Sequence, residues 1–201
     1  MPTPAVAGAE ALVRENVVAS IAVHEAILRD VNLLRGIAEA GKKIAEAMRQ
    51  GHRLLLMGNG GSAADAQHIA AEFVGRYRKE RRALPAMALT GNTSALTAIS
   101  NDYGFEDVFA RQVEAFAQPG DVLIGISTSG KSRNVAKALL LASAMQVTTV
   151  AMTGENGGVL KSAVDLCLCV PSGDTPRIQE GHILAGHAMA DIVERELFDV
   201  R

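Results

Sequence analysis

The sequence predicts an α/β fold, namely a three-layer α-β-α sandwich with a five-stranded parallel sheet that N-terminal helices precede. Short apolar runs, each followed by a Gly- or Ser-rich turn and a helical pattern, alternate after residue 51, which is typical of βαβ units. Before them, apolar residues recur at the spacing of helices. Parallel strands that helices cover on both faces have such continuous apolar runs. We expect strands at residues 54–57, 86–89, 122–126, 148–152 and 166–170.

The segment 9–50 is predicted to be helical. Its apolar residues recur at spacings of three and four residues, and only Gly36 and Gly41 interrupt them. This pattern indicates a helical hairpin or two consecutive helices. A long final helix is expected over 175–198, with Asp174 or Thr175 as its cap. Because the terminal helices are rich in Ala, they can pack closely against copies of themselves, and we expect them to form an oligomer interface.

Composition and charge argue against a nucleic-acid-binding protein and against a membrane-binding protein. The 201 residues are 48% hydrophobic, enough for a full core, and we expect 1–201 to form one domain. The 20 basic and 22 acidic side chains are mixed, without the concentrated positive charge that nucleic acid or an anionic membrane requires. Neither a signal-peptide pattern nor an apolar run of about 18 residues occurs, so we expect a cytoplasmic protein without a membrane partner.

Two glycine- and serine-rich turns follow predicted strands. The run Gly58-Asn59-Gly60-Gly61-Ser62 follows the first strand, and Ser127-Thr128-Ser129-Gly130-Lys131-Ser132 follows the third. Both turns open a helix, where backbone N–H groups and hydroxyls can bind an anion such as phosphate. The first can also be a tight turn that needs glycine, and the second a helix cap. Because both turns belong to one sheet, we favour a site that holds both ends of a polyhydroxylated phosphate.

The helix after the first turn carries a polar stripe that can bind a metal ion. Asp65, His68 and Glu72 are spaced three and four apart, so they project from one face. Such residues often form only a surface pair, but the flanking Ala and Ile residues indicate a packed helix whose polar stripe needs partners. Imidazole and oxygen ligands without thiolate suit zinc or a similar divalent ion at a catalytic site. The candidate partners on the final helix, among which helical periodicity does not choose, are Gln179, Glu180, His182 and His187.

Three other features have simpler interpretations. Asn101 and Asp102 can meet sugar hydroxyls, but from the residues alone we favour a cap of the next helix. Cys167 and Cys169 are expected to point to the same side of a strand as buried, reduced thiols without a mutual disulfide. A mainly solvated face is the interpretation of the basic cluster Arg76, Arg78, Lys79, Arg81 and Arg82.

At these residues the sequence closely resembles the phosphoheptose isomerases of the sugar isomerase (SIS) family. The resemblance covers nearly the whole chain after the first helix, in the collinear motifs GNGGSAADAQHIAAEF, LTAISNDYGFEDVFARQVEAF, GDVLIGISTSGKSRNV, VAMTGENGGVL and VPSGDTPRIQEGHILAGH. It implies a flavodoxin-like SIS domain, a homotetramer with active sites between subunits, and one zinc ion per subunit. It also implies interconversion of sedoheptulose 7-phosphate and D-glycero-D-manno-heptose 7-phosphate, which feeds the ADP-heptose or GDP-heptose of bacterial surface polysaccharides.

Position by position, the resemblance implies zinc ligands and so resolves what periodicity leaves open; the ligands are His68, Glu72, Gln179 and His187. The substrate contacts that it implies are Asn59, Gly60, Gly61, Glu72, Asn101, Asp102, Ser127, Thr128, Ser129, Ser132 and Gln179. An aldose–ketose isomerisation moves a proton between C1 and C2 through an enediol, so it requires a base and an acid. We expect Glu72 to be the base and His187 the acid.

Other functions compete with this one. A related SIS branch is a non-catalytic adaptor that binds the replication initiator DnaA and lacks the catalytic Glu and His, whereas Glu72 and His187 are present here. An isomerase of another sugar phosphate, for instance a hexulose phosphate, is expected to share the fold. A sugar-phosphate-sensing regulator would need a DNA-binding domain, and none is expected in this chain.

Overall fold

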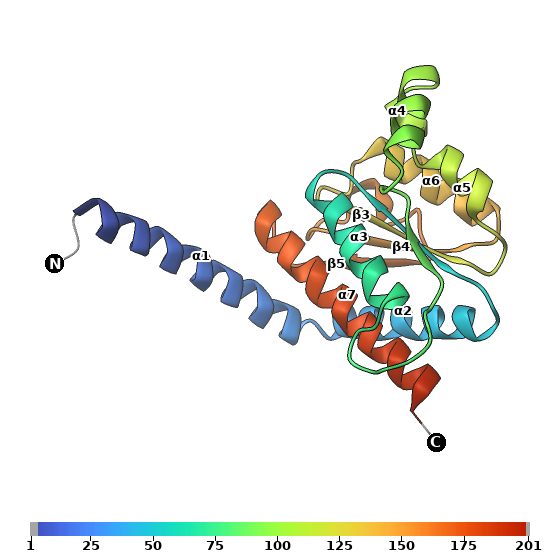
Figure 1. Ribbon diagram of the computed structural model, residues 1–201. Helices are drawn as coiled ribbons and strands as arrows, with labels where there is room; N and C mark the ends of the chain where they lie inside the picture. Colours follow the sequence, from blue (N-terminus) through green and yellow to red (C-terminus); the bar gives the residue numbers. More distant parts are fainter. Residues whose placement is uncertain (1–3, 200–201) are drawn as a thin grey trace.

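Five parallel strands form the centre of the computed structural model, which describes residues 4–199 (Figure 1). Their order is β2-β1-β3-β4-β5, the flavodoxin-like order. β1 and β3 are buried along their whole length, which explains their continuous apolar runs. Each strand ends one residue from the predicted carboxyl end. The strands are β1 (Leu54–Gly58), β2 (Ala86–Ala88), β3 (Val122–Ser127), β4 (Thr148–Thr153) and β5 (Leu166–Cys169).

Helices cover both faces of the sheet, which confirms the predicted three-layer sandwich. They are α2 (Val31–Arg49), α3 (Gly61–Val74), α5 (Ala110–Phe116), α6 (Arg133–Ala144) and α7 (Thr175–Phe198). Leu54 and Leu56 join one core with α2, α3 and α7, whereas Leu55 and Met57 join the second core with α5 and α6. A further helix, α4 (Thr93–Asp102), stands away from the sheet at the top of Figure 1.

Two consecutive helices, α1 (Pro4–Arg29) and α2, precede the sheet, which was one of the two expectations for this segment. The boundary is Asp30, whose carboxylate accepts hydrogen bonds from two backbone N–H groups in the first turn of α2. The interruption expected at Gly36 and Gly41 does not occur, because both lie inside α2. Close packing explains Gly36, since a β-carbon there would lie 2.8 Å from the Cδ2 atom of Leu168.

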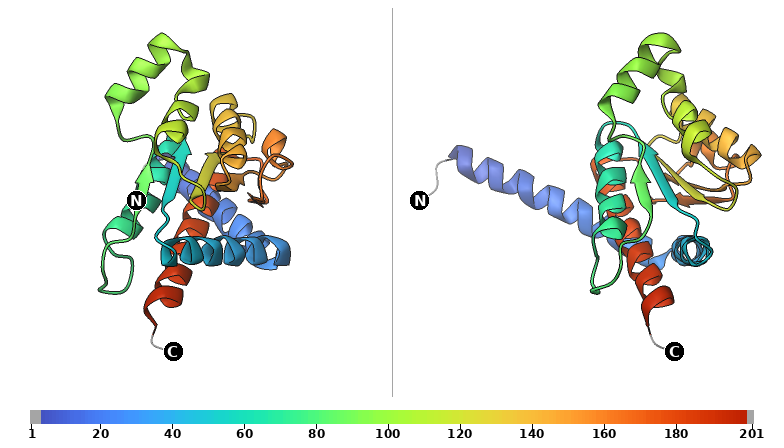
Figure 2. Two further views of the ribbon diagram at one scale, coloured as in Figure 1. Left: turned by 90° about the vertical axis from the view of Figure 1, so that its right-hand side faces the viewer. Right: turned by 45° about the vertical axis from the view of Figure 1, so that its right-hand side comes forward.

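Most of α1 projects from the body of the molecule (Figure 2). The large apolar side chains that it exposes are Leu12, Val13, Val17, Val18, Ile21 and Leu28. Within residues 4–199, no helix combines the length and apolar character needed to cross a membrane. Such a row of exposed apolar side chains is typical of a surface that another protein chain covers.

Cys167 and Cys169 lie on β5, an edge strand of the sheet. Their Sγ atoms are 3.6 Å apart and both thiols are free, so they share one side of the strand as predicted. The expectation of full burial is wrong, because both residues are only half-buried at the sheet edge.

The carboxyl ends of β1 and β3 lie where the winding of the sheet reverses. From β1 the chain passes to β2 on one side, and it then returns to β3 on the other side of β1. In open α/β sheets, ligands bind in the crevice at such a point. Both predicted anion-binding turns start here, because Gly58 at the end of β1 pairs with Ile126 of β3.

Candidate active site

Three side chains from α3 and α7 meet at one point. The Nε2 atom of His187 lies 2.9 Å from the Nε2 atom of His68 and 3.8 Å from the Oε1 atom of Glu72. The distance from His68 Nε2 to the same Oε1 atom is 3.4 Å. Glu72 is the least exposed of the three, with 20% of its side chain accessible. The helices therefore bring one carboxylate and two imidazoles into a single cluster.

The approach of α3 to α7 depends on a glycine beside this cluster. Ile69 of α3 is fully buried and packs against Gly186 of α7. A β-carbon on Gly186 would lie 2.5 Å from the Cδ1 and Cγ1 atoms of Ile69, which is closer than two carbon atoms can approach. Gly186 thus lets the helices pack closely, and the next residue, His187, reaches His68.

The donor atoms of the cluster fit a divalent metal ion. One atom from each of His68, Glu72 and His187 can be chosen so that all three lie within 4.8 Å of one another. In a neutral imidazole one ring nitrogen carries a proton and the other only accepts. Where the unprotonated nitrogens of two imidazoles face each other, a shared proton or a cation must lie between them. Imidazole and carboxylate are the ligands of many catalytic zinc sites.

Gln179 lies near the other end of the contact between α3 and α7. Its amide rests against Gly61, where a β-carbon would come within 2.3 Å of Gln179 Nε2. Gln179 and Asp65 line one open cavity of about 470 Å³. Burial raises the pKa of Asp65 to about 6, although the nearby His68 acts in the opposite direction. The predicted polar stripe is therefore divided, with Asp65 at this cavity and His68 at the cluster.

The other two candidates on α7 have partners elsewhere. Glu180 forms an ion pair with Arg177, with 2.8 Å between Oε1 and Nη2. His182 is buried, and its Nε2 atom lies 3.1 Å from the backbone oxygen of Thr153 at the end of β4. Burial lowers the pKa of His182 to about 4, against the effect of this hydrogen bond. Both residues therefore serve contacts outside the cluster.

The turn after β1 is tied to the helix that follows β3. The side-chain amides of Asn59 and Asn134 donate to each other's oxygens, each over 2.9 Å. Gly60 has a φ of +56°, a left-handed conformation that favours glycine. Gly61 then begins α3. The turn therefore has a defined conformation, and its backbone is exposed directly after the end of β1.

The turn after β3 gathers hydroxyl groups at the start of α6. The Oγ atoms of Ser127 and Ser132 are 2.8 Å apart, and Ser132 is the residue before the first turn of α6. Thr128 and Ser129 line a cavity of about 400 Å³. The cavity is also lined by Lys131, Gly154, Glu155, Asn156, Ser172 and Thr175. None of the described residues that line this cavity belongs to the cluster of His68, Glu72 and His187.

Comparisons with known proteins decide the family. A model of the SIS domain matches residues 21–154. A phosphoheptose isomerase from Geobacter metallireducens is 60% identical over 176 residues, which cover 88% of this chain and 92% of that protein. Another from Geotalea daltonii is 51% identical over 189 residues, or 93% and 98% of the two chains. This chain belongs to the phosphoheptose isomerase family.

Solved structures of phosphoheptose isomerases share the fold. The enzyme GmhA from Neisseria gonorrhoeae is 42% identical, with a TM-score of 0.87 over 92% of this chain and 98% of its own. A phosphoheptose isomerase from Francisella tularensis is 34% identical, with a TM-score of 0.88 over 93% and 98% of the chains. The expected SIS fold, with helices before a five-stranded parallel sheet, is therefore confirmed.

The expectation that Asn101 and Asp102 cap the next helix is wrong for this family member. Both are exposed and lie in the last turn of α4, where Asn101 Nδ2 donates to Asp102 Oδ1 over 2.8 Å. Asn92 caps α4, because its side chain accepts from a backbone N–H group of the first turn. The pair therefore stands at the end of a projecting helix with its polar atoms facing solvent.

The expectation of a solvated basic face is wrong at Arg81. Only 2% of its side chain is exposed, and its Nε atom lies 3.0 Å from Oε1 of the equally buried Glu194. Arg76, by contrast, is exposed over 61% of its side chain. Burial alone would raise the pKa of Glu194, but backbone N–H donors and Arg81 outweigh it and hold that pKa below its ordinary value.

Glu194 was missed from the sequence, although the helical spacing around it indicates that it is buried. It follows Ala190 and Val193 on α7 at the spacing of a buried helical stripe, and both of those residues are in the core. A carboxylate on such a stripe requires a buried partner. The sequence gives no indication that the partner is Arg81, 113 positions earlier.

Proposed function

We propose that this protein is an aldose–ketose isomerase that converts sedoheptulose 7-phosphate to D-glycero-D-manno-heptose 7-phosphate. The reaction is proposed to take place in the cytoplasm and to begin the supply of activated heptose for bacterial surface polysaccharide. The observation that carries the proposal is the 3.8 Å approach of Glu72 Oε1 to His187 Nε2, from two different helices. Relatives with 51% and 60% identity that are named phosphoheptose isomerases support it.

The proposed chemistry uses this carboxylate and imidazole as a base and an acid. Glu72 takes the proton from C1 of the ketose, and His187 donates a proton to the carbonyl oxygen at C2, which gives the enediol. Return of the proton to C2, with removal of the proton from the C1 hydroxyl, completes the aldose. Oε1 of Glu72 makes both contacts with the imidazoles, so we assign removal of the carbon-bound proton to Oε2.

Zinc is the proposed cofactor, one ion per subunit. The proposed ligands are His68, Glu72, Gln179 and His187, and the first, second and fourth of these lie together in the cluster. When bound, zinc supplies a Lewis acid that polarises the substrate carbonyl. Gln179 and His187 are eight residues apart on α7, a rise of about 12 Å. Because the Gln179 amide rests on Gly61, we assign the fourth ligand to a Gln179 from a neighbouring subunit.

The substrate is proposed to lie along the carboxyl edge of the sheet. The turn after β3, with Ser127, Thr128, Ser129 and Ser132, would bind the phosphate through hydroxyls and backbone N–H groups at the start of α6. Segment 59–61 would contact the sugar beside that turn. Because Glu72 lies eleven residues beyond Gly61 on α3, a rise of about 16 Å, the carbonyl end would reach the cluster of a neighbouring subunit. The phosphate and the adjoining hydroxyls of the substrate would then lie between the two turns that start where the sheet winding reverses.

A homotetramer with active sites between subunits is also proposed. The exposed apolar side chains of α1 supply a surface that another copy can cover. Asn101 and Asp102 stand on the projecting α4, and their side chains form hydrogen bonds only with each other among the described residues. Both features are explained if α1 packs against another subunit and α4 extends the substrate site of a neighbour.

The test is direct conversion of substrate. Purified protein with zinc is incubated with sedoheptulose 7-phosphate in deuterated water, and the aldose is followed by NMR. We expect heptose 7-phosphate with deuterium at C2, because a base that exchanges with solvent passes the proton through the enediol. Folded, zinc-supplied protein that gives no product would overturn the proposal. Conversion of a hexulose phosphate alone would indicate another sugar-phosphate isomerase.

A further inference from the structure

The imidazole of His187 packs against an aromatic ring from the loop after α3. The ring centroids of Tyr77 and His187 are 5.4 Å apart, with 20° between their planes, so the rings are stacked. The imidazole of His68 meets His187 edge-on, at 5.1 Å and 68°. His187 is therefore contacted by one ring along its face and by another at an angle, which limits its rotation.

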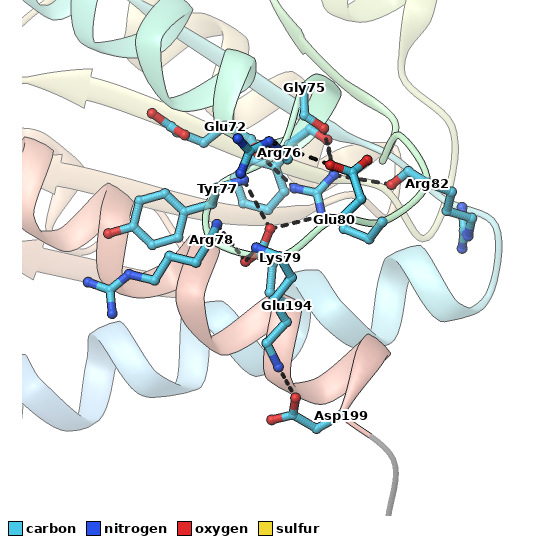
Figure 3. A network of polar contacts seen from close by, with 12 residues as sticks. Glu72, Gly75, Arg76, Tyr77, Arg78, Lys79, Glu80, Arg82, Glu194 and Asp199 are labelled. Atoms are coloured by element: carbon cyan, nitrogen blue, oxygen red, sulfur yellow. Dashed lines mark hydrogen bonds and ion pairs between the residues drawn. The ribbon is translucent and has the colours of Figure 1, made fainter.

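The position of Tyr77 is set by Glu194, which lies two turns beyond His187 on α7. Its carboxylate accepts hydrogen bonds from three consecutive backbone N–H groups, those of Tyr77, Arg78 and Lys79, at 3.0, 2.9 and 3.0 Å (Figure 3). Three donors on one carboxylate fix the backbone of this part of the loop. The loop and the proposed acid are thus held by the same helix.

Arg81 fixes the other end of the loop and the end of α3. Its Nη2 atom donates to the backbone oxygen of Glu72 over 2.7 Å, and its Nη1 atom donates to those of Phe73 and Gly75 over 2.8 and 3.0 Å. These carbonyl groups at the end of α3 lack the partners that a continuing helix would supply. Arg81 therefore joins the backbone of the proposed base to the loop that carries Tyr77.

Burial shows that this network is a fixed part of the structure. The side chains of Arg81 and Glu194 are 2% and 1% exposed, so each charge depends on the other and on the backbone groups around it. An exposed ion pair can break with little cost, whereas a buried one cannot. The loop 75–82 is therefore anchored between the ends of α3 and α7.

We propose that Tyr77 is a positioning residue for His187, and that the Arg81–Glu194 pair holds it in place. The inference rests on the proposed isomerase function, and it assigns Tyr77 no contact with substrate. By stacking on the imidazole, Tyr77 keeps Nε2 of His187 directed at Glu72 and His68. Partners that orient a metal-binding imidazole affect both metal affinity and turnover.

The test compares Tyr77→Leu, which removes the ring, with Tyr77→Phe, which keeps it. For Tyr77→Leu we expect zinc affinity and kcat each to fall about tenfold, with KM changed less than about twofold. Zinc affinity is measured by competition with a chromogenic chelator on protein first stripped of metal. Tyr77→Phe should stay within about twofold of the unmodified protein in all three quantities, because the stacked face is retained.

The outcomes separate this inference from the proposed function. If the unmodified protein does not convert sedoheptulose 7-phosphate, zinc affinity alone decides, and equal affinity in Tyr77→Leu overturns the positioning role. If conversion occurs, unchanged zinc affinity and kcat in Tyr77→Leu overturn it too. Equal losses in Tyr77→Phe would also count against it, because they would assign the effect to the hydroxyl group. Circular dichroism confirms folding, and Tyr77→Met replaces Tyr77→Leu if that variant does not fold.

Discussion

The Nε2 atoms of His68 and His187 lie 2.9 Å apart, although 119 positions separate the two residues in the chain. Each imidazole is directed at the other and at the same oxygen of Glu72, at 3.4 and 3.8 Å. Three donor atoms from two helices that converge in this way form a cluster whose members depend on each other. Two predictions concern this cluster, and two concern the buried Glu194 and His182 elsewhere on α7.

Removal of metal should lower both activity and stability. Dialysis against a chelator is expected to abolish turnover, and added zinc should restore it. Binding to the folded state alone stabilises by about 2.7 kcal/mol at a hundredfold excess over Kd, so zinc should raise Tm. Scanning calorimetry measures this shift. His187→Ala should lose the response, whereas His52→Gln, outside the cluster, should retain it. A zinc response that persists in both variants would contradict the assignment of ligands.

Removal of either proposed proton-transfer group should lower turnover. Glu72→Gln and His187→Gln are each expected to reduce kcat by about a hundredfold or more, because each loses a positioned base or acid. Size-exclusion chromatography should show the unmodified oligomeric state. Glu80→Gln removes a carboxylate that is 91% exposed and should leave kcat unchanged. Near-normal turnover in Glu72→Gln would exclude that residue as the base.

Glu194→Gln should destabilise the fold strongly. The amide places an NH₂ group against backbone N–H donors and leaves Arg81 buried without its counter-charge, and the loss of one partner of such a pair costs about 3–5 kcal/mol. Urea unfolding gives the change in free energy. As a control, Glu25→Gln breaks an exposed pair with Arg29 and should cost less than about 1 kcal/mol. Similar losses for both variants would show that burial of the Glu194 pair contributes little.

The stability should decrease in mild acid because of His182. Burial lowers its pKa from 6.5 to about 4, so between these values the unfolded chain binds a proton that the folded chain does not. The contribution of His182 to the free energy of unfolding therefore falls by about 3 kcal/mol as pH drops from about 6.5 toward 4. Asp65 acts oppositely, because its raised pKa makes the folded chain take up a proton in the same range.

The contribution of His182 is isolated by comparison with His182→Gln. The free energy of unfolding of each protein is measured by urea titration at several pH values between 4 and 7. Relative to the unmodified protein, the variant should lose less stability as the pH falls through this range, because it lacks the group that the unfolded chain protonates. Parallel curves for the two proteins would show that His182 does not cause the acid sensitivity.

Much of the fold was predictable because its determinants are local in the chain. The apolar runs at β1 and β3 follow from burial on both faces, and the turns after them follow from Gly and Ser. The error at Gly36 has the opposite origin. That glycine is needed for contact with Leu168, which is distant in sequence, and it does not break the helix.

The candidate site was predictable only in part, for the same reason. The spacing of His68 and Glu72 places both on one face of a helix. The choice of His187 over His182 depends on how α3 packs against α7, and therefore on Gly186 and Ile69, which helical periodicity does not reveal. The resemblance to phosphoheptose isomerases supplied that choice.

The reciprocal amide pair of Asn59 and Asn134 bears on the length of substrate that the protein accepts. Because this pair ties the turn after β1 to the start of α6, the two turns form one rigid unit. On the proposed reaction, a ketose phosphate one carbon shorter, anchored by the same phosphate, would hold its carbonyl about 1.5 Å away from the position that the seven-carbon chain reaches. A rigid binding unit of fixed length can thus select a seven-carbon chain without any group that recognises the extra carbon.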